Sequence, residues 1–137
     1  MELDHVNIAT PDASGLAETF ADLFGLEIVK RTEVADQGVR VVKLSAGNAV
    51  IEMTEPTGDD TPVGRFLAKN RPGLHHVCFR VDDLRATVRD LLTKGVVLVN
   101  EEPTIGAAGL PIVFVHPKSC GGVLVELQET PRESTEQ

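Results

Sequence analysis

Two histidines and two glutamates occupy matching places in the two halves of this sequence of 137 residues. His5 and His76 each precede a valine in a short β-rich run, and Glu52 and Glu126 each lie in an apolar run about 50 residues further on. Two imidazoles and two carboxylates suit a borderline divalent ion such as Co, Ni, Zn, Mn or Fe better than Ca or Mg. The duplicated spacing therefore predicts that these four side chains are the ligands of one metal ion.

Each of these residues taken alone has a plainer interpretation. A single histidine near the start of a strand is more often a surface or capped residue, and a single glutamate in an apolar strand is more often an edge residue or an ion-pair partner. His75 competes with His76 as a ligand, but it should point to the opposite face of the strand. His116 has no counterpart in the first half, so we interpret it as structural or as lining the mouth of the substrate site.

The elements that must position these residues also repeat along the chain. In the first half we predict a helix over 13–24 and strands over 3–9, 26–34, 39–44 and 49–53. A short helix over 63–69 should follow. In the second half we predict a helix over 84–94, a loop over 102–111, and strands over 74–81, 96–99, 112–115 and 123–127. Asp12, and Asp82 or Asp83, should begin the two main helices as N-caps, and Gly25 and Gly95 should end them.

This order predicts an α+β fold made of two tandem β-α-β-β-β units, about 3–55 and about 74–129. Their curved mixed sheets should surround a shared metal-binding cleft. We expect a single domain over residues 1–130, followed by a polar tail over 131–137.

Alternation along the strands supports this arrangement. Glu52, His76 and Glu126 each fall on the more polar face of their strand, whereas the opposite face is rich in valine, isoleucine, leucine, methionine and phenylalanine. The helices should therefore cover the apolar faces, and the polar faces should line the cleft.

The composition argues against several classes of function. The net charge is −8 at pH 7, which argues against nucleic acid as a partner. No run approaches the roughly 18 apolar residues of a membrane-spanning helix, and the first residues lack the basic and apolar regions of a signal peptide. We therefore expect a cytoplasmic protein with no membrane partner, whose two cysteines, Cys78 and Cys120, are reduced thiols.

Longer strings of the sequence resemble a known family. They are LDHVNIATPD at 3–12, DTPVGRFLAKN at 60–70, GLHHVCFRVDD at 73–83, IGAAG at 105–109 and HPKSCGGVLVEL at 116–127. The chain resembles the vicinal oxygen chelate superfamily, to which glyoxalases and bleomycin resistance proteins belong, and within it the methylmalonyl-CoA epimerase family. The most specific part is the His-Pro-Lys loop that runs into Val-Glu-Leu, together with the short helix before His-His.

The resemblance implies the same four metal ligands, a divalent ion as cofactor, a small acyl-CoA as substrate and a homodimer. It implies interconversion of (2R)- and (2S)-methylmalonyl-CoA in propionate metabolism, by removal and return of the α-proton through an enolate that the metal stabilises. Two positions depart from the family. Glu52 stands where many members carry glutamine, and Val41 stands where some members carry a catalytic glutamate.

Under this hypothesis Glu126 is the first candidate for a proton carrier and Glu52 is the second, because a carboxylate ligand can turn toward the substrate. Since Val41 cannot transfer a proton, the identity of the second acid/base stays open. Lys118, near the expected mouth of the cleft, and Gln37, in a predicted turn, are candidate substrate-binding residues. The alternative for Lys118 is an ordinary solvated lysine.

Two other functions would use similar features. A glyoxalase I-like lyase would share the ligand set and a related enediolate chemistry, but it should carry basic and amide residues for glutathione, a pattern that this sequence does not show. A non-catalytic protein of the same fold that sequesters a small ligand would usually have lost at least one metal ligand, whereas this sequence keeps four.

We predict that one divalent ion binds within about 2.0–2.3 Å of His5, Glu52, His76 and Glu126. The reason is the duplicated spacing, which is hard to reach by chance in both halves. A crystal structure at full metal occupancy measures these distances. An ion held by His75 in place of His76, or a Glu52 side chain turned away from the ion, would contradict the assignment.

Overall fold

The computed structural model describes residues 1–131, and these divide into two compact units. One unit is His5–His76, and the other combines Met1–Asp4 with the described residues from Val77 onward. Of the predicted polar tail, residues 132–137 lie outside the described residues. Within the described residues, no helix is long and apolar enough to cross a membrane.

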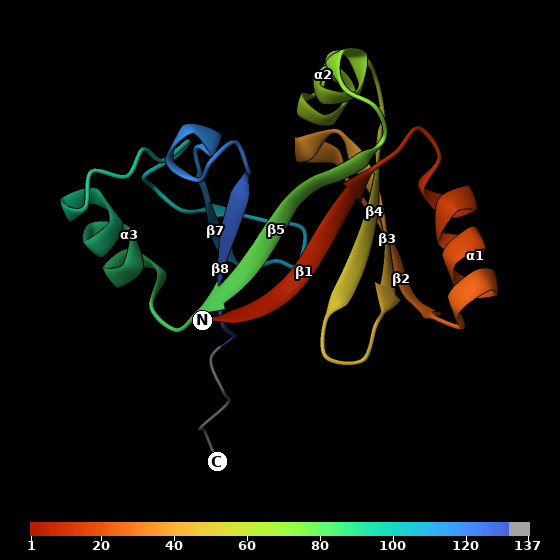
Figure 1. The fold of residues 1–137 in the computed structure, drawn as a ribbon, viewed down its shortest axis with the longest axis horizontal. Coiled ribbons are helices and arrows are strands. Elements are labelled where there is room, and N and C mark those ends of the chain that lie inside the picture. The colour runs from red at the N-terminus through yellow and green to blue at the C-terminus, as the bar shows by residue number, and fades with distance from the viewer. Residues whose placement is uncertain (132–137) are drawn as a thin grey trace. The chain divides into compact units, whose positions relative to one another are not determined.

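Each half of the chain follows the β-α-β-β-β order that the sequence predicts (Figure 1). The first half contains β1 (Glu2–Ala9), α1 (Ala13–Phe24), β2 (Glu27–Val34), β3 (Val39–Ser45) and β4 (Val50–Pro56), and α2 (Pro62–Lys69) follows. The second half contains β5 (Gly73–Val81), α3 (Leu84–Thr93), β6 (Thr104–Ile105), β7 (Pro111–Val115) and β8 (Val125–Glu129). Single 3₁₀ turns, η1 (Ala35–Gln37) and η2 (Pro117–Ser119), precede β3 and β8.

The strands pair in the same way in both units. The order is β2-β3-β4-β1 in one unit and β5-β8-β7-β6 in the other. In each, the first strand of the repeat pairs in parallel with the last, β1 with β4 and β5 with β8, and the other neighbours are antiparallel. The shared topology confirms the predicted α+β class and its duplication.

The helices that follow β1 and β5 cover the apolar faces of the sheets. Ala13 and Ala17 of α1 pack on Val42, Leu44 and Met53 of β3 and β4. In the other unit, α3 packs in the same way against β7 and β8. Since strand residues alternate between faces, Glu52, beside Met53, must lie on the face opposite α1. In each unit the main helix therefore covers the apolar face of the sheet, as the sequence predicts.

The short helix α2 packs on the other face of β3, in a third cluster of buried residues. Val63 of α2 contacts a group formed by Ala9, Val39 and Val41. Val41 is only 3% exposed. Val41, at whose position the resemblance implies a catalytic glutamate in some family members, is thus part of an apolar core beneath α2.

Side-chain caps fix the starts of the two main helices, as the sequence predicts. The Asp12 carboxylate accepts a hydrogen bond of 3.0 Å from the Gly15 amide, and the Asp83 carboxylate accepts one of 3.0 Å from the Ala86 amide. The second cap is therefore Asp83 rather than Asp82. Each bond satisfies an amide that the helix itself leaves without an acceptor.

A second carboxylate ties each helix start to the last strand of its repeat. Glu55 at the end of β4 accepts a hydrogen bond of 3.0 Å from the Ala13 amide, and Glu129 at the end of β8 accepts one of 3.1 Å from the Leu84 amide. These glutamates were not singled out from the sequence. They join the first residue of each helix to the strand that carries a candidate ligand, and so fix helix and strand relative to each other.

The prediction of a strand over 96–99 is wrong, because this segment does not pair along its length with a neighbouring strand. In the described chain this segment has one isolated bridge, Leu98 to Val115, and the second strand of the second repeat is instead β6, inside the predicted loop 102–111. The physical reason is that the Val97 amide donates to the Ser119 hydroxyl at 2.9 Å. A side chain thereby takes a donor that a ladder would need.

The last strand also begins later than predicted, at Val125 instead of Val123. Gly121 and Gly122 adopt φ of 63° and 94°, and the Val123 amide donates to the Cys120 carbonyl at 3.1 Å. These left-handed glycines keep the chain in a turn, so Val123 remains outside the ladder.

We predict that Glu129→Ala lowers the free energy of unfolding by about 1 kcal/mol, because the Leu84 amide at the start of α3 loses its acceptor. Urea unfolding followed by circular dichroism measures the change. The matched control is Glu27→Ala at an exposed strand position, which should change stability by less than about 0.5 kcal/mol. Equal effects of the two substitutions would contradict the anchoring role.

Candidate functional site

Three of the four predicted ligands meet inside the unit of residues 5–76. His5 Nε2 lies 3.3 Å from Glu52 Oε1 and 3.3 Å from His76 Nε2. The residues are 3%, 5% and 9% exposed, respectively. They come from β1, β4 and the start of β5, and the parallel register of β1 and β4 brings the two strands into contact at this level. The duplicated pattern thus corresponds to a real cluster of nitrogen and oxygen donors.

The cluster has dimensions suited to a metal ion. One ligand atom from each residue lies within 4.8 Å of the other two. Two ligands held about 2.1 Å from one ion, at octahedral to tetrahedral angles, are about 3.0–3.4 Å apart, which matches the two separations of 3.3 Å. Two imidazoles and a carboxylate are the donors that a borderline divalent ion prefers. The residues present therefore fit such an ion.

Glu52 is surrounded by further partners. Asn7 donates from Nδ2 to Glu52 Oε1 at 3.1 Å and to the Thr54 hydroxyl at 2.7 Å, and Lys43 Nζ lies 3.6 Å from Glu52 Oε2. A buried carboxylate needs such partners because water no longer solvates it. These contacts occupy both carboxylate oxygens and hold Oε1 toward His5.

Asn7 itself contains an acceptor whose partner is missing. Its Oδ1 is buried and has no hydrogen-bond partner among the residues that the structure describes. The Glu52 carboxylate requires the Asn7 NH₂ group on its side, so turning the amide over would place two acceptors together. This oxygen is therefore directed away from Glu52 as a further acceptor within the polar cluster.

His75 supports His76 instead of replacing it. His75 Nδ1 lies 2.8 Å from His76 Nδ1, and the His75 ring packs edge-on against Phe66 of α2 with centroids 4.7 Å apart. His76 thus uses Nδ1 toward His75 and Nε2 toward His5. A hydrogen bond to the outer nitrogen is the usual way to fix the orientation and tautomer of a ligating imidazole.

The fourth predicted ligand belongs to the other unit. Glu126 lies on β8, is 6% exposed, and is paired in register with Cys78 of β5 and Phe114 of β7. It is thus buried at the place in its repeat that corresponds to Glu52. Its participation in the same site is part of the proposal below.

The two predicted substrate-binding residues lie in the two 3₁₀ turns. Lys118 is exposed in η2, and Gln37 is partly buried at the end of η1. His116 accepts a hydrogen bond on Nδ1 from the Lys118 amide at 3.1 Å and so caps η2. This contact supports the structural interpretation of His116.

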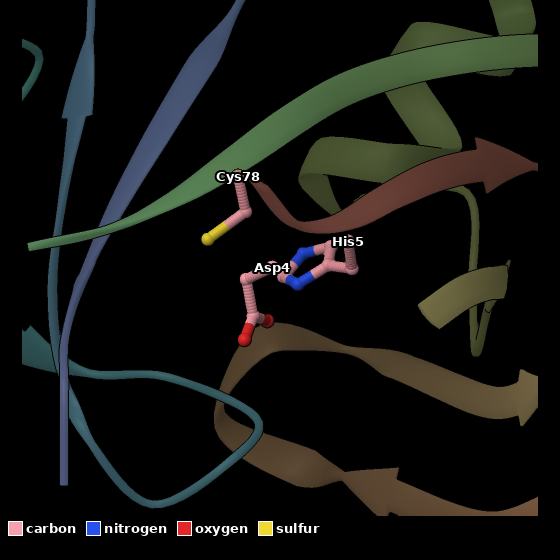
Figure 2. Close-up of side chains that lie close together, drawn as sticks. All are labelled: Asp4, His5 and Cys78. Atoms are coloured by element: carbon pink, nitrogen blue, oxygen red, sulfur yellow. The ribbon is translucent and has the colours of Figure 1, made fainter. Parts of the chain in front are cut away.

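A second group of side chains that could ligate a metal comes from β1 and β5. Figure 2 shows Asp4, His5 and Cys78, which are carried by β1 and β5. Asp4 accepts a hydrogen bond of 2.9 Å from Arg80, and this bond, with a second from Arg80 to Glu2, raises the pKa of the guanidinium. Since a permanently charged arginine pairs with Asp4, we interpret this group as structural. Among the described residues, Cys78 and Cys120 form no disulfide bond.

A family model described as the Glyoxalase/Bleomycin resistance protein/Dioxygenase superfamily matches residues 4–114. The chain belongs to this superfamily. The match covers the donor cluster and most of both repeats, which confirms the family resemblance of the motifs. The α+β fold of paired β-α-β-β-β repeats is the fold of this superfamily.

Individual proteins that resemble this chain carry more specific names than the superfamily. The chain is 42% identical to the human protein named mitochondrial methylmalonyl-CoA epimerase, over 93% of this chain and 73% of the relative. It is 40% identical to an ethylmalonyl-CoA/methylmalonyl-CoA epimerase of Cereibacter sphaeroides, over 93% of this chain and 96% of that protein. A crystal structure of methylmalonyl-CoA epimerase from Mycobacterium tuberculosis superposes with a TM-score of 0.90 at 38% identity, covering 96% of this chain and 89% of that one.

The sequence analysis did not identify Asn7 and Lys43 as neighbours of Glu52. It also did not identify the contact between His75 and His76. Asn7 shares a strand face with His5, which was a usable signal. Lys43 gave no such signal, because its contact with Glu52 depends on the pairing register of β3 and β4. A single sequence does not specify that register.

We predict that Asn7→Ala lowers the free energy of unfolding by about 2 kcal/mol, because Glu52 and Thr54 lose a shared buried donor. Thermal and urea unfolding of the metal-free protein measure the effect. Asn48→Ala, in an exposed turn, is the matched control and should change stability by less than about 0.5 kcal/mol. If Asn7→Ala behaves like this control, the hydrogen-bond network around Glu52 is not as described.

Proposed function

We propose that this chain is a methylmalonyl-CoA epimerase that interconverts the (2R) and (2S) forms of its substrate. The observation that carries the proposal is the buried cluster of His5, Glu52 and His76, in a chain 42% and 40% identical to proteins named for this activity. A superfamily match alone would leave a glyoxalase I-like lyase equally open, but both of these relatives are named epimerases.

In the proposed site Glu126 joins His5, Glu52 and His76 to hold a divalent ion, which is Co, Ni, Zn, Mn or Fe on the chemistry of the donors. Bound there, the ion supplies a Lewis acid that spreads the negative charge arising on the thioester oxygen when the α-proton leaves. The residues around Glu52 hold its carboxylate in place beside His5.

The reaction needs two proton transfers at one carbon. A carboxylate takes the α-proton from the carbon between the thioester and the free carboxylate, and an acid returns a proton to the opposite face. We assign the first transfer to Glu126. Glu52 is the weaker candidate for the second, because Asn7 and Lys43 hold its two oxygens. Val41 supplies no acid or base, so the identity of the second carrier stays open.

The remaining proposed roles concern the binding of the acyl-CoA substrate and the assembly and location of the protein. Lys118 pairs with a phosphate or the free carboxylate, and Gln37 donates a hydrogen bond from its side-chain amide. We propose that residues 1–130 act as one domain, that two chains form a homodimer, and that the protein works in the cytoplasm in propionate metabolism.

We predict that Glu126→Gln lowers both epimerisation and α-proton exchange by about 10²–10⁴. Glu52→Gln should be milder, because an amide oxygen still coordinates a metal. The measurement is deuterium exchange of (2R)- and (2S)-methylmalonyl-CoA in heavy water, followed by NMR, with metal content determined for each variant. If Glu52 is the second proton carrier, Glu52→Gln blocks epimerisation and leaves exchange of one epimer intact.

Controls separate this function from its alternatives. Removal of the metal with a chelator should abolish exchange, and adding back a divalent ion should restore it. A glyoxalase I-like lyase would instead convert the hemithioacetal of glutathione and methylglyoxal, and a small-ligand-binding protein would catalyse neither reaction. Near-normal turnover of Glu126→Gln at confirmed metal occupancy contradicts the proposed mechanism.

A further inference from the structure

Lys43 is a charged residue beside the donor cluster that takes no part in either proton transfer of the proposed reaction. Its Nζ lies 3.6 Å from Glu52 Oε2, and the two side chains are only 15% and 7% exposed. The two residues are direct partners in the antiparallel register of β3 and β4, so their side chains emerge on the same face. The contact is therefore fixed by the sheet rather than by a mobile surface chain.

The two oxygens of Glu52 face different groups. Oε1 accepts from Asn7 at 3.1 Å and lies 3.3 Å from His5, whereas Oε2 faces Lys43. A metal held by His5 would approach Oε1, and the ammonium group would remain on the other side of the same carboxylate. Lys43 thus pairs with Glu52 without taking the oxygen that is directed toward the histidines.

This arrangement has opposite consequences with and without the ion. In the metal-free protein, a buried carboxylate is costly unless a cation or hydrogen-bond donors compensate for it, so Lys43 stabilises the site. In the metal-bound protein, the ammonium is a second positive charge close to the ion and repels it. Glu52 and Lys43 together have no net charge, so the ion keeps more of its positive charge for the substrate.

We propose that Lys43 is a positioning residue that holds Glu52 ready for the metal and offsets its charge, at the expense of metal affinity. The inference rests on the proposed metal site but not on the epimerase reaction. It states that removing Lys43 destabilises the metal-free protein and yet tightens metal binding. A lysine with a merely structural role would have the first effect without the second.

The test is a double-mutant cycle of Lys43→Met, Glu52→Gln and the double variant, with metal removed. Each single variant leaves one buried charge without its partner and should lower the melting temperature by about 5 °C. The double variant removes both charges and should recover most of that loss. If the effects of the single substitutions simply add, the two side chains are not coupled and the proposal is overturned.

The second readout is the affinity for Zn²⁺, measured by competition with a chromophoric chelator. Lys43→Met should bind Zn²⁺ roughly tenfold more tightly than the unaltered protein, and Lys43→Arg should bind it with unchanged affinity. The visible spectrum of the Co²⁺ form should stay that of the unaltered protein in both, because the ligands are unchanged. Weaker or equal Zn²⁺ binding by Lys43→Met overturns the charge-offset role.

Controls keep the outcomes distinct. Lys69→Met removes the same charge from an exposed position on α2 and should alter neither stability nor affinity. If Lys43→Met does not fold, the double variant decides, because its recovery is expected and its failure contradicts the pairing. If the unaltered protein binds no Zn²⁺ or Co²⁺, the metal site of the proposed function fails, which differs from a metal site that binds but shows no dependence on Lys43.

Discussion

The burial of the Glu52 carboxylate is the constraint on which much of this structure depends. A carboxylate that is 5% exposed in the middle of an apolar strand is tolerated only if donors and cations surround it. Asn7 of β1 donates a hydrogen bond to the carboxylate, His5 of β1 lies 3.3 Å from it, and the cation is Lys43 of β3. A slip of one residue in the register of β4 would turn Glu52 toward the apolar core under α1, so the polar cluster and the hydrophobic core fix each other.

The helices contribute to this register from the other face. Glu55, three residues after Glu52, receives the first amide of α1, and Glu129, three residues after Glu126, receives the first amide of α3. Since each helix also packs on the strands through its apolar face, the strand end is held by a polar bond and by side-chain packing together. The repeat therefore duplicates the positioning of a candidate ligand as well as the ligand itself.

Local signals predicted the parts of the fold that depend on short stretches of chain. The limits of α1, its cap Asp12 and the left-handed Gly25 agree with the structure, because capping and periodicity act within a few residues. The strand over 96–99 failed because a donor of that segment goes to Ser119, far along the chain. For the same reason the pair Lys43–Glu52 could not be derived, whereas Asn7 shared a strand face with His5 and duplication brought His5, Glu52 and His76 into one hypothesis. The joining of Glu126 to them remains a prediction.

The division of β1 and β5 between the compact units has a consequence for how such a protein could arise. The first four residues belong with the second repeat, and residues 73–76 of the second repeat belong with the first, so His76 lies in the unit that His5 begins. One repeat by itself supplies a single histidine and a single glutamate from the duplicated set. A half-length ancestor would therefore have supplied the three-donor cluster only as a pair of copies, with residues of both copies in one site. Fusion of the two copies would have made that pairing intramolecular.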